Sequence, residues 1–194
     1  LPHGLGTVSV PDDRRDRRPI AAEKIAPFAG APLEPTGDPM ADGVGPAARA
    51  ERADRPDLDV HGPPRQRPMR LLSGFSIDEN DPDPRGWAVV GMDGAVGGKV
   101  TDIWFDQMER TIRYLEVATD PTYQSRPVLL PINFLQPDAK RGAYYAHALR
   151  GYQFATVPAT KSPDQVTLLE EEKITAYYGG GTLYATPQRA EPIL

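Results

Sequence analysis

Ionisable side chains gather in the stretch GKVTDIWFDQMERTIRYLEV, which runs from residue 98 to residue 117. Asp106, Glu109, Arg113 and Glu116 lie within eleven residues of it. Two carboxylates beside an arginine can have pKa values that differ, which suits groups that accept and release protons. The alternative is a hydrated turn with a surface ion pair, which contributes little to stability. Spacing alone leaves both interpretations open.

A second group of chemically active residues lies in PDLDVHGPP, where Asp57, Asp59 and His61 alternate along the chain. An extended backbone would place all three on one side. An imidazole beside carboxylates can accept a proton or bind a divalent metal. One imidazole makes a poor zinc site, so Asp59 and His61 are at most a weak metal site. A polar loop is the alternative.

The elements that must position these residues are short strands, predicted from about residue 69 onward. β-branched and aromatic residues mark the strands, and Asp93-Gly94 and the segment 137–142 are typical of hairpin turns. The expected strands are 71–76, 88–92, 96–105, 111–118, 128–135 and 143–149. This pattern predicts a mainly β fold, a small antiparallel barrel or sandwich, with residues 106–110 as an acidic turn.

Thr167 and Glu170 form a capping box that opens a C-terminal helix, expected to reach about residue 178. The glycines at 179–181 either end that helix or mark a close packing contact. We expect the acidic run 170–172 to face solvent or a partner. The domains are thus an extended segment 1–68, a β domain 69–160 and a C-terminal helix with a tail, 161–194.

The N-terminal segment is rich in Pro and Gly. The stretch 35–48 has one of them every few residues, so we expect neither a helix nor a central strand there. Apolar residues recur through the segment. These favour a segment that becomes ordered by docking on another surface, with free disorder as the alternative.

Composition limits the function. The 194 residues carry 18 Gly, 22 Pro and only 39% hydrophobic residues, so part of the chain lies outside a packed core. A net charge of −5 argues against nucleic-acid binding through bulk electrostatics. The absence of Cys excludes disulfides and thiol chemistry. No phosphate-binding loop, GxSxG elbow or HExxH motif is present.

Eight blocks along the chain together resemble the H subunit of the purple bacterial photosynthetic reaction centre. The resemblance covers essentially the whole chain. The blocks are LPHGLGTVSVP, RPIAAEK, PTGDPMADGVGPA, DRPDLDVHG, RPMRLLSGF, GKVTDIWFDQMERTIRYLEV, LLP and KSPDQVTLLEEEKITAYYGGGTLYATPQRAE.

This resemblance implies a PRC-barrel domain on the cytoplasmic face of the photosynthetic inner membrane, with one transmembrane helix that would precede Leu1. It implies a non-catalytic subunit that caps the pigment-binding L and M subunits, supports assembly and quinone-to-quinone electron transfer, and conducts protons to the secondary quinone. Bacteriochlorophyll, bacteriopheophytin, quinones and non-haem iron would belong to the partner subunits and none to this chain. A cytochrome subunit, antenna complex and membrane lipids are further implied partners.

Site residues follow from the resemblance position by position. Asp59 and His61 match positions where protons enter, and Asp106 and Glu109 match acidic positions beneath the secondary quinone. Arg52 and Arg113 match basic positions that tune the local potential. Pro63 stands where the best-known members have a second His, so added zinc should bind weakly here.

Two other function classes remain open on the sequence. One is a free-standing PRC-barrel adaptor that binds a protein or RNA partner without photochemistry. The other is a carboxylate-dependent hydrolase, which would need a concave pocket that brings Asp106 and Glu109 together.

Overall fold

The computed structural model describes residue 9, residues 11–12 and residues 16–189. Two helices, α1 (Pro39–Asp42) and α2 (Leu168–Tyr184), accompany the strands. The strands of the described residues are β1 (Ala22–Lys24), β2 (Leu33–Pro35), β3 (Gln66–Pro68), β4 (Ala88–Gly91), β5 (Val96–Asp106), β6 (Thr111–Thr119), β7 (Pro127–Pro131), β8 (Gln136–Asp138) and β9 (Ala143–Ala146). The predicted mainly β fold with a C-terminal helix is confirmed.

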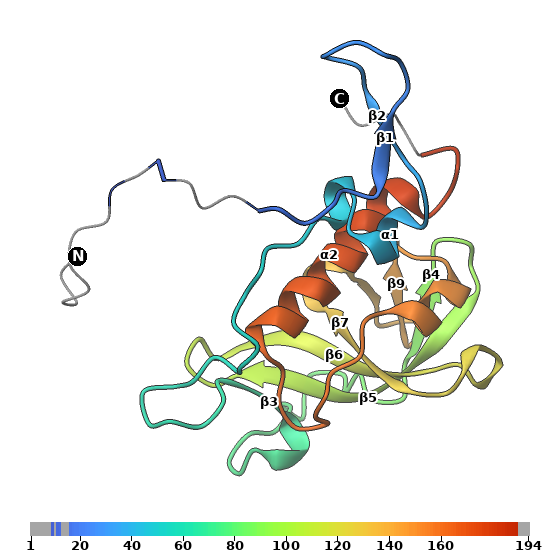
Figure 1. The fold of residues 1–194 in the computed structure, drawn as a ribbon. Helices are drawn as coiled ribbons and strands as arrows, with labels where there is room; N and C mark the ends of the chain where they lie inside the picture. The colour runs from blue at the N-terminus through green and yellow to red at the C-terminus, as the bar shows by residue number, and fades with distance from the viewer. Residues whose placement is uncertain (1–8, 10, 13–15, 190–194) are drawn as a thin grey trace.

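Within the described residues, one sheet has the strand order β7-β6-β5-β4-β9-β8, and β3 pairs with β5 beyond this path. Every pairing in this sheet is antiparallel except that of β4 with β9. Both predicted hairpin turns are present, between β4 and β5 and between β8 and β9. Figure 1 shows α2 lying across the sheet.

The long hairpin β5–β6 supplies much of the core. Ile103, Trp104, Leu115 and Val117 are all at most 1% exposed. Their β-branched and aromatic side chains pack well on a pleated surface. The alternation is broken by irregularities after Val100 and after Trp104, as expected for β-bulges, which re-aim neighbouring side chains.

Three of the predicted strands are wrong or too long. The strand predicted at 143–149 ends at Ala146 in β9, and a turn follows. Residues 71–76 form no strand; a 3₁₀ helix (Met69–Leu71) leads into turns there. The strand predicted at 128–135 ends at Pro131 in β7, and a 3₁₀ helix (Ile132–Phe134) follows. Pro131 has no N–H for a longer ladder. The short strand β3, which the sequence pattern did not predict, pairs Gln66 with Asp106.

An ion-pair cluster fixes the chain after β3 to the sheet. Arg70 Nη1 lies 2.9 Å from Asp102 Oδ2 on β5 and 2.9 Å from Glu116 Oε2 on β6. Glu116 also accepts a hydrogen bond from the indole N–H of Trp104. Asp102 is buried, and a buried carboxylate needs such a partner. The cluster therefore holds β3 in register beside β5.

The capping box at the start of α2 is confirmed. Thr167 Oγ1 accepts the N–H of Glu170, and Glu170 Oε2 accepts the N–H of Thr167. The helix does not end at residue 178 but continues through the three glycines to Tyr184. Of the described helices, none is long and apolar enough to cross a membrane.

The glycines of α2 form a close contact with the N-terminal third of the chain. A Cβ at Gly180 would lie 2.6 Å from the Cβ of Ala47. Met40, Val44 and Ala47 are almost fully buried. Figure 1 shows α1 beside the C-terminal half of α2. The part of the segment that carries these residues therefore docks on this chain's own last helix.

A helix within residues 35–48 contradicts the prediction of none there. α1 has a single turn, and its three boundary residues explain it. Asp38 caps the N-terminus by accepting the N–H groups of Met40 and Ala41. Pro39 occupies the first turn, where its missing N–H costs nothing. Gly43 ends the helix at φ 76°, a left-handed conformation suited to glycine.

Replacing Gly180 with Ala should destabilise the protein by roughly 1–3 kcal/mol, because the added methyl overpacks the contact with Ala47. This loss exceeds the gain in helix propensity of about 1 kcal/mol. Urea unfolding of the variant measures the difference. The matched control is Thr182→Ala at an exposed position of the same helix, which should leave stability nearly unchanged. Equal stability of both variants would contradict the packing argument.

Candidate functional site

The turn between β5 and β6 is built around Asp106. Its carboxylate is completely buried, and Oδ1 accepts the N–H groups of Met108 (2.9 Å) and Glu109 (3.0 Å). These hydrogen bonds close the turn, which also needs a left-handed residue, Arg110, at φ 53°. Asp106 thus fixes the position from which Glu109 projects.

Arg65, which immediately precedes β3, joins three carboxylates. Its Nη2 lies 2.6 Å from Asp106 Oδ2 and 2.8 Å from Glu109 Oε1. Its Nη1 lies 3.2 Å from Asp57 Oδ2. Arg113 approaches the other Glu109 oxygen at 3.6 Å. The planar guanidinium is well suited to this role because its donors point in several fixed directions.

The pKa values at this junction move in opposite directions. Burial, the largest influence on Asp106, raises its pKa, but hydrogen bonds from the Glu109 N–H and from Arg65 outweigh it, so the pKa lies below the ordinary value. The hydrogen bonds of Arg65 to Asp106 and then to Glu109 raise the pKa of the guanidinium. Arg65 therefore stays charged, and Asp106 stays ionised at neutral pH.

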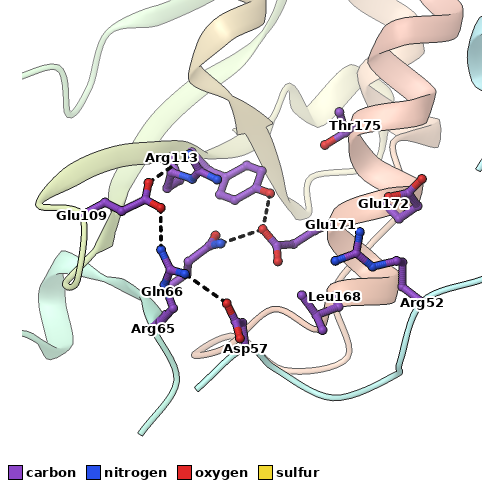
Figure 2. A pocket seen from close by; sticks show the side chains of 11 residues that line it. Arg52, Asp57, Arg65, Gln66, Glu109, Arg113, Leu168, Glu171, Glu172 and Thr175 are labelled. Atoms are coloured by element: carbon purple, nitrogen blue, oxygen red, sulfur yellow. Dashed lines mark hydrogen bonds and ion pairs between the residues drawn. The ribbon is translucent and has the colours of Figure 1, made fainter. Parts of the chain in front are cut away.

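Beside this junction lies a polar pocket of about 310 Å³. Figure 2 shows Glu109, Arg113, Arg65 and Asp57 on one side, with Arg52 and the start of α2 on the other. Its lining residues are Arg52, Asp57, Arg65, Gln66, Glu109, Arg113, Tyr114, Leu168, Glu171, Glu172 and Thr175. A pocket lined with so many ionisable groups suits water and protons better than an apolar ligand.

Glu171 holds the α2 wall of the pocket to the sheet. Its Oε1 accepts hydrogen bonds from the Gln66 side-chain amide (2.7 Å) and from the Tyr114 hydroxyl (2.8 Å). Burial and then the charge of Glu171 raise the pKa of Tyr114, which therefore remains a donor. The buried Oε1 of Gln66 has no hydrogen-bond partner among the described residues. Such an acceptor at a polar pocket suits an ordered water.

The acidic run at the start of α2 does not simply face solvent. Glu170 is buried and caps the helix. Glu172 Oε1 accepts the backbone N–H of Ala50, and Glu171 lines the pocket. Only the helix-opening role of this run was predicted from the sequence. The contacts of Glu171 and Glu172 depend on residues 57 to 122 positions away in the chain.

Asp59 and His61 lie on a loop that leaves the pocket and returns to it. Its base is a backbone hydrogen bond from Arg65 N to Asp57 O, and Leu58 pairs with Pro64. The chain reverses at residues 59–62, where Asp59 Oδ1 accepts the N–H of His61 at 2.6 Å. The chain is therefore not extended through His61, so the condition under which Asp57, Asp59 and His61 would share one side is not met.

The structure brings together four of the six residues expected at the site. Asp106, Glu109 and Arg113 meet at the turn, and Arg52 lines the same pocket from the other wall. Asp59 and His61 lie on the loop and do not line the pocket. Among the described residues, no group of three or more His, Cys, Asp or Glu side chains is arranged to hold a metal ion.

Arg65, Gln66, Tyr114 and Glu171 were not predicted as site residues. One signal was available for Arg65: a carboxylate at the end of a strongly apolar strand needs a cation if it is buried. That argument does not choose among the arginines of the chain. The choice depends on β3, a three-residue strand with no periodicity to reveal it.

Comparison with known families matches two parts of the chain. Residues 1–71 match the model described as the photosynthetic reaction centre H-chain N-terminal region. Residues 78–153 match the PRC-barrel domain, which includes strands β4–β9. The two matches follow one another in the chain and confirm the resemblance found in the sequence. The two matches therefore support an H-subunit-like protein, a photosynthetic reaction centre subunit, which fits the photosynthetic membrane and association with other reaction centre subunits.

Proposed function

We propose that this subunit caps the pigment-binding L and M subunits on the cytoplasmic side, supports their assembly, and conducts protons to the secondary quinone. It does so as a non-catalytic subunit of the complex. The pigments, quinones and non-haem iron belong to the partner subunits. Residues 1–68 contribute to docking on these partners. The match of residues 1–71 to the H-chain favours this role over that of a free-standing adaptor.

The observation that supports proton conduction is the junction at Arg65. One cation holds three carboxylates, of which Asp106 is fully buried while Glu109 is 51% exposed. The buried, ionised carboxylate positions the exposed one, because Asp106 accepts the Glu109 N–H and shares Arg65 with it. Glu109 is thereby held at the mouth of a polar pocket, where it can exchange protons with water.

Each residue of the site has a distinct role in this proposal. Asp59 and His61 collect protons on the exposed loop, and Asp57 stands where that loop meets the pocket. Glu109 takes up the proton and passes it on. Arg65 cannot carry the proton itself because a guanidinium does not deprotonate in proteins. Arg52 and Arg113 set the potential, and Asp106 acts mainly as an ionised anchor rather than as a carrier.

The test of the overall proposal is isolation of the complex through an affinity tag on this protein. We expect two bacteriochlorophyll-binding membrane subunits to co-purify with it. We also expect removal of this chain to slow proton uptake that accompanies quinone reduction after a flash. Purification without pigment-binding subunits would contradict the proposal.

Replacing His61 with Ala should slow proton uptake by the assembled complex several-fold, because Pro63 leaves no second imidazole beside it. A pH-indicator dye after a flash measures the rate. His147→Ala is the matched control, since His147 is also exposed but lies just after β9, hydrogen-bonded to Gln136 of β8. Unchanged uptake in the His61 variant would mean that protons enter elsewhere.

A further inference from the structure

The hairpin of β1 and β2 forms an arm that is separate from the main sheet. Figure 1 shows it projecting beyond α1 and α2. Its tip, residues 25–33, contains no charged residue and exposes Ile25 (50%) and Phe28 (58%). A lone two-stranded hairpin is marginally stable in water and normally needs another surface to pack on.

The backbone of the tip is already prepared for burial. Ile25 N–H donates to Pro32 O at 3.0 Å, and Ala31 N–H donates to Phe28 O at 3.2 Å. The ammonium group of Lys24 donates to the carbonyl oxygens of Phe28 and Ala29. Because these backbone groups already have internal partners, burying them against an apolar surface would cost less desolvation energy than burying unpaired groups.

The ladder behind the tip carries an unfavourable charge pair. Glu23 and Glu34 lie directly opposite each other across β1 and β2, and both are exposed. Like charges in this position destabilise a hairpin. Within the described part of the chain, neither carboxylate forms an ion pair. Lys24, the nearest ammonium in the sequence, is bonded to the tip carbonyls instead. A cation from another molecule would relieve the repulsion.

We propose that the arm docks on another protein subunit of the reaction centre, at an apolar pocket bordered by a Lys or Arg. Ile25 and Phe28 would enter the pocket, and Glu23 and Glu34 would meet the basic side chain. A membrane surface fits less well, because the anionic cytoplasmic leaflet repels paired carboxylates. The arm lies within the H-chain N-terminal region, and this inference rests on the proposed association with the pigment-binding subunits.

The experiment titrates the pigment-binding core, stripped of this chain, with full-length protein and its variants. Phe28→Ser should weaken association about tenfold or more, as expected for an aromatic anchor. Glu34→Gln should weaken it several-fold, and the effect should grow at low salt. The controls are Tyr152→Ser and Glu79→Gln, which alter exposed residues that are not part of the arm and should bind like the unchanged protein.

Hydrogen exchange separates docking from a merely structural role. In the free protein, Glu34→Gln removes the cross-strand repulsion, so the amides of Ile25 and Ala31 should exchange more slowly. The same substitution should weaken docking. If Glu34 acted only through the stability of the arm, the variant with slower amide exchange should also bind the core more tightly. On assembly of the unchanged protein, these two amides should become strongly protected.

Three outcomes would overturn the inference. The first is unchanged affinity in both arm variants, and the second is failure of the unchanged protein to bind the core. The third is Phe28-dependent binding to vesicles of phosphatidylcholine and phosphatidylglycerol with no effect on core binding, which would assign the arm to lipid. Proton conduction is tested separately in the assembled complex, so either idea can fail while the other stands.

Discussion

Replacing Glu109 with Gln slows the second, proton-coupled reduction of the secondary quinone by about tenfold or more and leaves primary charge separation unchanged. Gln cannot take up and release a proton, although it has nearly the same shape. We expect a rate loss at or below the lower end of the range that is usual when a proton-transfer group is removed, because Asp57 and Glu171 are further carboxylates in the pocket that can carry protons. Flash-induced absorbance changes of the semiquinone measure the rate.

Two controls define this result. Glu79→Gln removes an exposed carboxylate away from the pocket and should leave the second electron transfer unchanged. The stability of the Glu109 variant should fall by only about 1 kcal/mol or less, because its partners Arg65 and Arg113 are reached from a half-exposed side chain. A normal second reduction in the Glu109 variant would show that the proton bypasses this turn.

Replacing Asp106 with Asn should lower the free energy of unfolding by about 3 kcal/mol at neutral pH. The carboxylate is completely buried and holds Arg65 at 2.6 Å. Loss of one partner from a buried ion pair leaves the other insufficiently compensated. Chemical denaturation of the free protein measures the effect. A loss no larger than that of the Glu109 variant would mean that the junction does not contribute to folding.

This contribution should depend on pH in one direction. The pKa of Asp106 is lower in the folded protein than its ordinary value of 3.8. The folded state therefore binds this proton more weakly than the unfolded state does. The stabilisation is fully present above about pH 4 and is lost as the pH falls through the folded-state pKa. The difference between the unchanged protein and the Asp106→Asn variant should accordingly shrink below about pH 4.

The sequence predicted the β5–β6 hairpin well because its signal is local. Alternating β-branched and aromatic residues and the acidic turn all lie within one stretch. The same stretch contains Asp106, Glu109 and Arg113. The strand predicted at 71–76 failed because Leu71 and Leu72 are apolar residues of a 3₁₀ turn held by Arg70. Local pattern does not show such long-range ion pairs.

The same limit explains what the sequence missed at the site. Arg65 acquires its function from carboxylates 41 and 44 positions later in the chain. Glu171 lies 105 positions from Gln66, whose amide it accepts. The α1 turn had all its boundary residues in the sequence, but it is stabilised by packing against α2. Only the tertiary structure brings these partners together.

The contact between the N-terminal third and α2 also sets an order of events during synthesis. Ala50 and its acceptor Glu172 are 122 positions apart. At ribosomal rates of about 5–20 residues per second, the surface that buries Met40 and Val44 emerges on the order of 10 s after them. During that interval these apolar side chains have no partner helix on their own chain. A nascent protein of this kind is therefore most exposed to aggregation or chaperone capture before its last helix is made.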